Sequence, residues 1–273
     1  MRELSMAEIQ TESLEILKKI DAICNECNFR YFLAYGTLIG AVRHNGFIPW
    51  DDDIDIWMPR SDYDSFIQYC EKNKDNIRPF VLMSQYNNDN YPFGISRLVD
   101  TRFLLDVKNE ISYGLGLFVD IYPLDGAGDT EKEYQERKKR ASRYSSLCFL
   151  ASRVSLEKGT TKELKKKILK IPAYIYAKAK GTRYFLKKLE EISKERDYET
   201  CDYIGCVVWG TDGVKAIFPK EWFQSWISHE FNGSYFRIPK DYDDVLKRLY
   251  GDYMKLPPAE KRVGHHYYVA YEK

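Results

Sequence analysis

Two aspartates that alternate with isoleucines, in Asp53-Ile54-Asp55-Ile56, constrain the fold of this 273-residue chain more than any other feature. Side chains two residues apart on a strand share a face and lie about 6–7 Å apart. A strand over residues 53–58 therefore places both acids on one face and both isoleucines in a core. Two neighbouring carboxylates repel each other, and Mg²⁺ relieves the repulsion while leaving positions for water and substrate phosphates.

The residues before this strand supply a second element of a phosphate site. Residues 31–42 are typical of a strand, a tight turn at Gly36-Thr37 and a short helix. Backbone N–H groups and the positive dipole end of a helix start bind phosphate oxygens. Together with the acids, this turn predicts a metal-dependent transfer at a phosphorus centre.

A third acid, Asp120, lies in the apolar run 117–122, where a buried charge is costly without a partner. Two metals that hold an in-line displacement need several carboxylate oxygens, so Asp120 is a candidate third ligand. In the predicted strand 93–98, Arg97 could pair with a donor phosphate or with these acids. The competing interpretation pairs Arg97 with Asp100 or with a nearby surface acid.

The acidic motif also has a less specific interpretation. Runs such as 51–53 are usually solvated loop residues, and Asp-x-Asp pairs often occur by chance. Three features favour the functional interpretation here. Isoleucines alternate with the acids, Pro49-Trp50 fixes the entry into the strand, and the Gly-Thr turn precedes it.

Three segments carry a resemblance to a known family: Gly36-Thr37, the run 43–56 that contains Arg43 and Trp50, and the run 117–125. They resemble the LicD family, whose bacterial members are phosphocholine transferases and whose animal relatives include the fukutin-related ribitol-phosphate transferases. The run 43–56 is highly specific. The resemblance has weaker support from four C-terminal features: segments 218–223 and 250–254, Pro257-Pro258 and His265.

The resemblance implies an α+β fold: a nucleotidyltransferase-like mixed sheet flanked by helices, with a helical insertion. It also implies that Asp-x-Asp holds Mg²⁺, with Mn²⁺ as an alternative. The implied reaction moves a phospho-alcohol, phosphocholine first among them, from a CDP-alcohol donor such as CDP-choline to a sugar hydroxyl and releases CMP. The acceptor would be a cell-surface glycan or teichoic acid precursor, which a lipid can carry.

We assign residues on these grounds. The catalytic and metal-binding residues are Asp53, Asp55 and Asp120, and Asp120 is the candidate to accept the proton of the sugar hydroxyl. The predicted substrate contacts are Tyr35, Gly36, Thr37, Arg43, Trp50, Arg97, Tyr122 and His265. For His265, a plain surface tail is the alternative to a phosphate contact. The rival functions are transfer of the nucleotide itself and a non-catalytic adaptor that binds membranes or polyanions.

Aromatic residues make up 15% of the chain, with 22 tyrosines. Aromatic side chains bind quaternary ammonium groups such as choline through cation–π attraction. Most of them are expected in the core or at its edge. Tyr35, Trp50, Tyr122 and Trp209 are the predicted members of a choline cage.

We divide the chain into a catalytic core (1–128), a basic helical segment (129–198) and a mixed C-terminal segment that completes the cleft (199–273). Between residues 158 and 188 lie eleven lysines or arginines and one acid, Glu163, although the whole chain carries a net charge of only +1. This segment could contact an anionic membrane surface, bind nucleic acid or form a solvated face that balances an acidic core. No recognised nucleic-acid module is present, so we expect no nucleic-acid partner.

No run reaches the ~18 apolar residues of a membrane span, and the N-terminus lacks a signal-peptide core. We therefore expect a cytoplasmic protein, with peripheral contact at the inner face of the cell membrane as an open question. The six cysteines fit reduced thiols. Cys24 and Cys27 have zinc-like spacing, but they fall on the apolar stripe of a first helix that starts after Ser5 and ends near Asn28.

Overall fold

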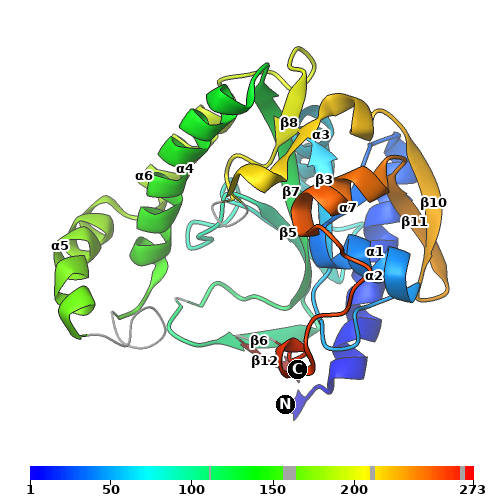
Figure 1. Cartoon of the computed structure of the whole chain (residues 1–273). Coiled ribbons are helices and arrows are strands. Elements are labelled where there is room, and N and C mark those ends of the chain that lie inside the picture. The colour runs from blue at the N-terminus through cyan, green and yellow to red at the C-terminus, as the bar shows by residue number, and fades with distance from the viewer. Residues whose placement is uncertain (111, 156–163, 210–212, 265–267) are drawn as a thin grey trace.

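The computed structural model describes residues 1–110, 112–155, 164–209, 213–264 and 268–273 (Figure 1). Its centre is a mixed sheet of strand order β2-β3-β7-β5-β4, in which β3 and β7 run parallel and the other pairs run antiparallel. The strands are β2 (Phe32–Leu33), β3 (Asp55–Pro59), β4 (Phe80–Met83), β5 (Ser96–Asp100) and β7 (Leu117–Gly128). The predicted α+β architecture is confirmed.

Strands β3 and β7 form the middle of this sheet, and every residue of both is buried. Strands covered on both faces are rich in apolar residues, so the acids in them stand out. The parallel register places Asp55 opposite Asp120 and Trp57 opposite Tyr122. The pairing therefore brings two of the predicted acids together.

Three helices from the first part of the chain pack against the sheet: α1 (Met6–Cys27), α2 (Tyr35–His44) and α3 (Arg60–Lys72). Helix α1 begins with the predicted capping box, in which Ser5 and Glu8 bond each other's backbone N–H groups. It ends at Asn28, which adopts the left-handed conformation with φ 55°. Six isoleucines and leucines of α1 are among its buried residues, so this helix covers the sheet with its apolar stripe.

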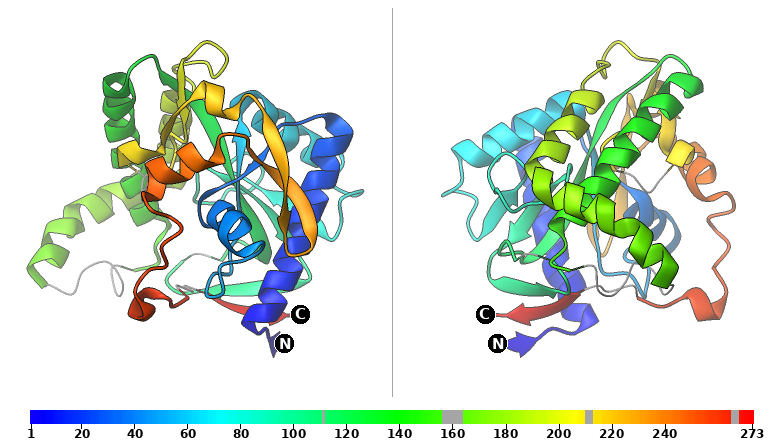
Figure 2. Two further views of the ribbon diagram at one scale, coloured as in Figure 1. Left: turned by 45° about the vertical axis from the view of Figure 1, so that its right-hand side comes forward. Right: turned by 90° about the vertical axis from the view of Figure 1, so that its left-hand side faces the viewer.

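The second group of helices comprises α4 (Glu131–Ser152), α5 (Leu164–Lys180) and α6 (Thr182–Ser193). Helix α4 packs against both α5 and α6, and these helices lie on the side of the sheet opposite α1 and α2 (Figures 1 and 2). The expected helical character of this segment is confirmed. Pro172 lies inside α5 and does not split it.

The C-terminal segment returns to the sheet and closes the fold. It contains β8 (Tyr203–Gly205), η1 (Gly213–Ala216), β9 (Ile217–Pro219), η2 (Lys220–Phe223), β10 (Trp226–Phe231), β11 (Ser234–Pro239), α7 (Tyr242–Tyr250), η3 (Ala259–Lys261) and β12 (Tyr268–Glu272). Strand β8 pairs with β7, whereas β12 joins β1 (Arg2–Glu3) to β6 (Phe103–Val107). The two chain ends therefore lie side by side (Figure 1). The domain boundaries at 128 and 198 stay a prediction.

Several predicted element boundaries are wrong. Strand β3 starts at Asp55 rather than Asp53, because its pairing with β7 begins at Asp55. Residues 48–51 ahead of it form a turn in which the Asp51 N–H donates to the Ile48 carbonyl at 2.9 Å. The predicted strand 93–98 starts only at Ser96. The hairpin β10–β11 was not predicted, although its Asn232-Gly233 turn, with φ 48° and 74°, carries a known hairpin signal.

We predict that Trp57 on β3 is a main packing residue of the fold. Its side chain is fully buried, and its ring lies 4.8 Å from Tyr35 and 5.7 Å from Phe223 between centroids. Trp57→Ala should lower the free energy of unfolding by about 3–5 kcal/mol, and Trp57→Phe should lower it by less. Urea unfolding measures both; equal losses in the two variants would contradict a packing role.

Candidate active site

The N-terminus of α2 lies directly against the acidic run. A Cβ atom on Gly36 would sit 2.8 Å from Asp51 Oδ2, so any larger residue there would displace the Asp51 carboxylate. The preceding residue, Tyr35, has a φ of 43°, which is unusual for a residue other than glycine and is typical of strained functional sites. The Thr37 hydroxyl oxygen accepts a hydrogen bond from the Asp55 N–H at 2.9 Å and ties α2 to the start of β3.

Three consecutive acids form a cluster beside this helix start. One carboxylate oxygen from each of Asp51, Asp52 and Asp53 lies within 4.8 Å of the others, which suits a hard divalent cation. Asp52 also accepts a hydrogen bond from the hydroxyl of Tyr268 on β12. The pKa of Asp53 is raised to about 8, first by desolvation and then by the negative charges of Asp51, Asp52 and Asp120.

Asp120 is held by a buried ion pair with Arg97. Arg97 Nε donates to Asp120 Oδ1 at 2.6 Å, and Nη2 donates to Oδ2 at 3.4 Å. The guanidinium carbon lies 4.5 Å and 4.0 Å from the ring centroids of Phe93 and Phe118. Burial raises the pKa of Asp120, and the charge of Arg97 opposes that shift. Of the partners proposed for Arg97, the structure selects the acids, because Asp100 pairs with Arg102.

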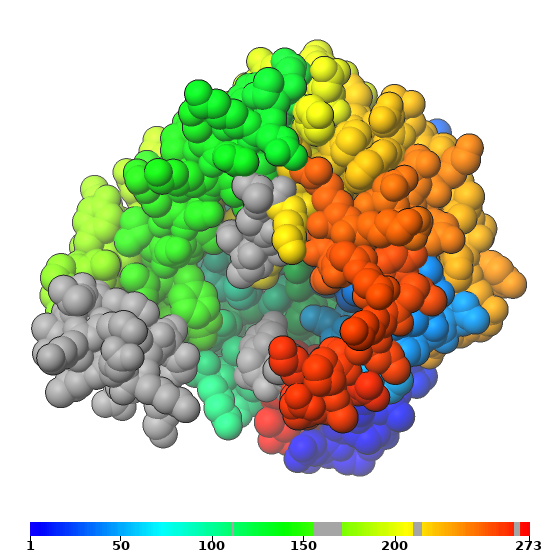
Figure 3. All heavy atoms as spheres, in the orientation of Figure 1, coloured from blue at the N-terminus to red at the C-terminus, as the bar shows by residue number. Residues whose placement is uncertain are grey.

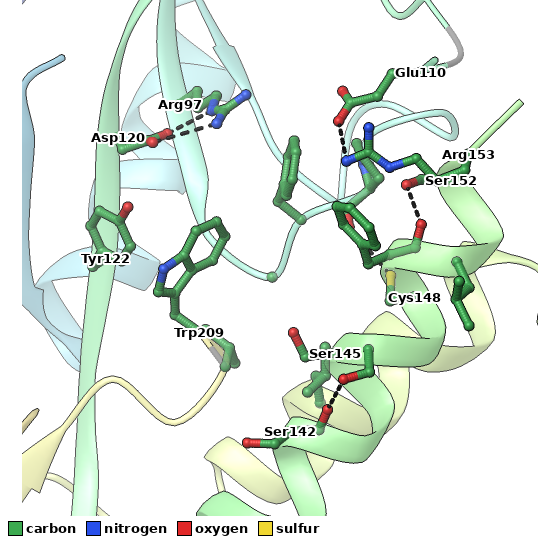
Figure 4. Close-up of a pocket in the computed structure, with 18 of the residues that line it drawn as sticks. Arg97, Glu110, Asp120, Tyr122, Ser142, Ser145, Cys148, Ser152, Arg153 and Trp209 are labelled. Atoms are coloured by element: carbon green, nitrogen blue, oxygen red, sulfur yellow. Dashed lines mark hydrogen bonds and ion pairs between the residues drawn. The ribbon is translucent and has the colours of Figure 1, made fainter. Parts of the chain in front are cut away.

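A cavity of about 860 Å³ lies between the sheet and α4. The space-filling view shows the molecule hollowed between α4 and the C-terminal segment (Figure 3). Arg97, Asp120 and Tyr122 line the sheet side, and Ser142 and Ser145 line the α4 side (Figure 4). The cavity is therefore formed jointly by the predicted core and the predicted helical segment.

The structure brings together five of the predicted residues. Asp53, Arg97, Asp120, Tyr122 and Trp209 all line the cavity. Their shared surface combines two acids, one arginine and two aromatic rings. That combination can hold a charged substrate and exchange a proton with it.

Other predicted residues lie around this surface. The ring of Tyr35 packs edge-on against Tyr122 at 5.1 Å, so it supports that ring from behind. Trp50 is half-buried and packs against the core. Arg43 lies in the last turn of α2, where its Nη1 donates to the Tyr253 carbonyl at 2.6 Å. His265 lies outside the described residues.

Sequence reasoning missed part of the site. Asp51 and Asp52 were visible only as an acidic run, and the structure makes them part of the cluster with Asp53. Phe93 was placed inside a strand, but it precedes β5 and lines the cavity. The face of α4 that lines the cavity was missed as well, although its serines at 142, 145, 146 and 152 recur at helical spacing.

Two further expectations concern the rest of the chain. Among the described residues, no helix is both long enough and apolar enough to cross a bilayer. All six cysteines are free, and among the described residues the acidic cluster is the candidate metal group. Contact of the basic helices with an anionic membrane, a cytoplasmic location and the absence of a nucleic-acid partner stay predictions.

Comparisons with known proteins agree on one family. The sequence profile described as LicD/FKTN/FKRP, nucleotidyltransferase domain, matches residues 28–152, from the end of α1 to the end of α4. Lipopolysaccharide cholinephosphotransferase LicD of Haemophilus influenzae is 33% identical, and the alignment covers 99% of both chains. An uncharacterised Rickettsia typhi protein is 27% identical over 69% of this chain and 65% of its own length.

The Arg97–Asp120 ion pair predicts strong energetic coupling. Arg97→Gln leaves a buried carboxylate without its counter-charge and should cost about 3–5 kcal/mol of unfolding free energy. Adding Asp120→Asn should recover much of that loss, because the uncompensated charge is then gone. Urea unfolding of the native protein, the two single variants and the double variant gives the coupling energy. Additive losses of unfolding free energy would contradict a stabilising ion pair.

The raised pKa of Asp53 predicts a defined pH dependence. Between its ordinary pKa of 3.8 and about 8, the folded protein keeps a proton that the unfolded chain loses. Metal-free protein should therefore lose stability as pH rises through this range. A divalent ion must displace the proton, so Mg²⁺ affinity should fall by about tenfold per pH unit below 8.

Thermal unfolding with and without Mg²⁺, measured from pH 5 to 9, tests both expectations. The stabilisation by Mg²⁺ should grow with pH in the native protein and vanish in Asp53→Asn. Asp106→Asn, which removes an exposed acid on β6, is the matched control. Stabilisation that is independent of pH would exclude Asp53 as a ligand.

Proposed function

The chain belongs to the LicD family, and on that premise we propose that it transfers phosphocholine from a CDP-linked donor to a sugar hydroxyl and releases CMP. The support from homology is the full-length relative that is named for choline phosphate transfer to lipopolysaccharide. The observation that carries the proposal is the cavity itself, since Asp53, Asp120 and an aromatic surface share it beside the start of α2.

The donor diphosphate would lie at the N-terminus of α2. Gly36 and Thr37 lie in its first turn, and the N–H groups of a first helical turn bind anions. The oxygen donors of Asp51, Asp52 and Asp53 fit a hard cation, so they would hold Mg²⁺ or Mn²⁺. When bound, the ion supplies positive charge that neutralises the diphosphate. Asp55 and Asp120, adjacent in register, complete the predicted ligand set.

The choline group would bind to the aromatic surface of the cavity. The ring centroids of Tyr122 and Trp209 are 5.6 Å apart, and those of Phe93 and Trp209 are 6.1 Å apart. Such a row presents ring faces that attract a quaternary ammonium group. Lys138 of α4 donates hydrogen bonds to the carbonyls of Cys206 and Trp209 and so positions the Trp209 backbone.

Asp120 is the proposed general base. The sugar hydroxyl oxygen forms a bond to the choline-bearing phosphorus, and the bond from that phosphorus to the CMP oxygen breaks. The hydroxyl proton passes to Asp120, and CMP leaves with the bonding electrons. Burial raises the pKa of Asp120 and makes it a better base, while Arg97 fixes its orientation.

This mechanism predicts that Asp53→Asn and Asp120→Asn each lower kcat by at least about 10²–10³. Asp106→Asn should keep native activity, because its carboxylate lies on the exposed face of β6. The assay follows CDP-choline labelled separately in the choline and in the cytidine group. Choline label should appear on the glycan and cytidine label in free CMP.

Two results would contradict the proposal. Cytidine label on the glycan would indicate nucleotidyl transfer by the same acids. Native turnover in either aspartate variant, with circular dichroism and melting temperature unchanged, would remove the assigned roles. Binding to anionic vesicles without any metal-dependent turnover would favour the adaptor alternative.

A further inference from the structure

The cavity has a second polar surface across from the acids. Five residues of α4 at helical spacing and Arg153, the C-cap of this helix, line it: Ser142, Ser145, Ser146, Phe149, Ser152 and Arg153. Together with Glu110, which lines the same cavity, we call this surface the α4 wall. The donor contacts proposed above lie on the sheet side of the cavity and at Trp209, so they leave the α4 wall to a second ligand.

Glu110 is the most unusual member of the α4 wall. Its side chain is only 5% exposed and pairs with Arg153 through Oε1 at 2.9 Å. The second carboxylate oxygen, Oε2, accepts no hydrogen bond from any residue that the structure describes. A buried acceptor without a donor costs free energy, which a ligand hydroxyl can recover.

The neighbouring groups add an aromatic face and hydroxyls. The guanidinium carbon of Arg153 lies 3.8 Å from the ring centroid of Phe149, which is 39% exposed. The Ser146 and Ser152 hydroxyls donate to the carbonyls of Ser142 and Phe149, at 2.8 Å and 2.9 Å. Their oxygen lone pairs therefore stay available as acceptors.

These groups match a carbohydrate. A sugar offers several hydroxyl donors and an apolar C–H face that packs on an aromatic ring. A phosphate group fits poorly, because Glu110 repels it and already pairs with Arg153. Ser145 lies on α4 across from Trp209 and Tyr122, so a ligand on this wall faces the acids (Figure 4).

We infer that the α4 wall binds the carbohydrate acceptor and presents one of its hydroxyls to Asp120. This inference rests on the proposed function, since it gives the acceptor of that reaction a site. The helical segment is then a substrate-binding wall of the enzyme. Donor and acceptor occupy opposite sides of one cavity, and the transferred group moves between them.

Binding measurements on the full chain test the site without relying on turnover. The probes are deacylated lipopolysaccharide oligosaccharide, a lipid-free teichoic acid fragment and CDP-choline, each titrated by calorimetry. Glu110→Gln and Phe149→Ala should weaken binding of the glycan probe by about tenfold. Ser145→Trp should abolish glycan binding, because the indole ring would occupy the cavity space in front of the α4 wall. The Kd for CDP-choline should stay within about twofold in Glu110→Gln and Phe149→Ala.

The matched control is Arg143→Trp, which adds the same ring on the exposed face of α4 and should change neither affinity. Native glycan affinity in all three wall variants, or no glycan binding by the native chain, would overturn the inference. An equal loss of CDP-choline affinity in Glu110→Gln and Phe149→Ala would assign the wall to the donor instead.

A second variant separates this inference from the proposed function. Asp53→Ala should lose CMP release but keep the native affinity for the glycan probe. The native chain could also bind glycan through the α4 wall but release no CMP from CDP-choline. That result would support the glycan site and refute the proposed reaction. Loss of glycan binding in Asp53→Ala would contradict the assignment of donor and acceptor to opposite sides of the cavity.

Discussion

The parallel pairing of β3 with β7 is the constraint on which the rest of the site depends. It places Asp55 beside Asp120 on two strands that are buried throughout, where two carboxylates are costly. The fold compensates for one charge with the guanidinium of Arg97 on the next strand, which is itself enclosed by two aromatic rings. The acids ahead of β3 cluster in a way that suits a divalent cation, and desolvation and the neighbouring negative charges raise the pKa of Asp53 among them.

The cavity combines two surfaces with different chemistry. Its sheet side carries charge and aromatic rings, and its α4 side carries neutral hydroxyls and an internally compensated ion pair. The sheet side suits a phosphate and a quaternary ammonium group, and the α4 side suits a polyol. With the two surfaces face to face, each substrate of the proposed reaction would have its own environment, and only the reacting atoms would need to meet.

The sequence allowed the local elements to be predicted, but not how they meet. Alternation of acids and isoleucines indicated β3, the Ser5–Glu8 box indicated the start of α1, and a lone acid in an apolar strand indicated Asp120. The position of α4 against the sheet was not predictable, because helical spacing defines its serine face but not the surface opposite. Likewise, the Tyr268–Asp52 hydrogen bond joins residues more than two hundred positions apart, so no local sequence pattern predicts it.

That last contact has a consequence for handling the molecule. Strand β12 lies between β1 and β6, and Arg2 pairs with Glu272 at 2.8 Å, so both chain ends are secured to one small sheet. Tyr268 in the same strand holds the acidic run. A truncation that removes β12 therefore also removes the hydrogen bond to Asp52, and one that removes β1 takes away a strand that pairs with β12.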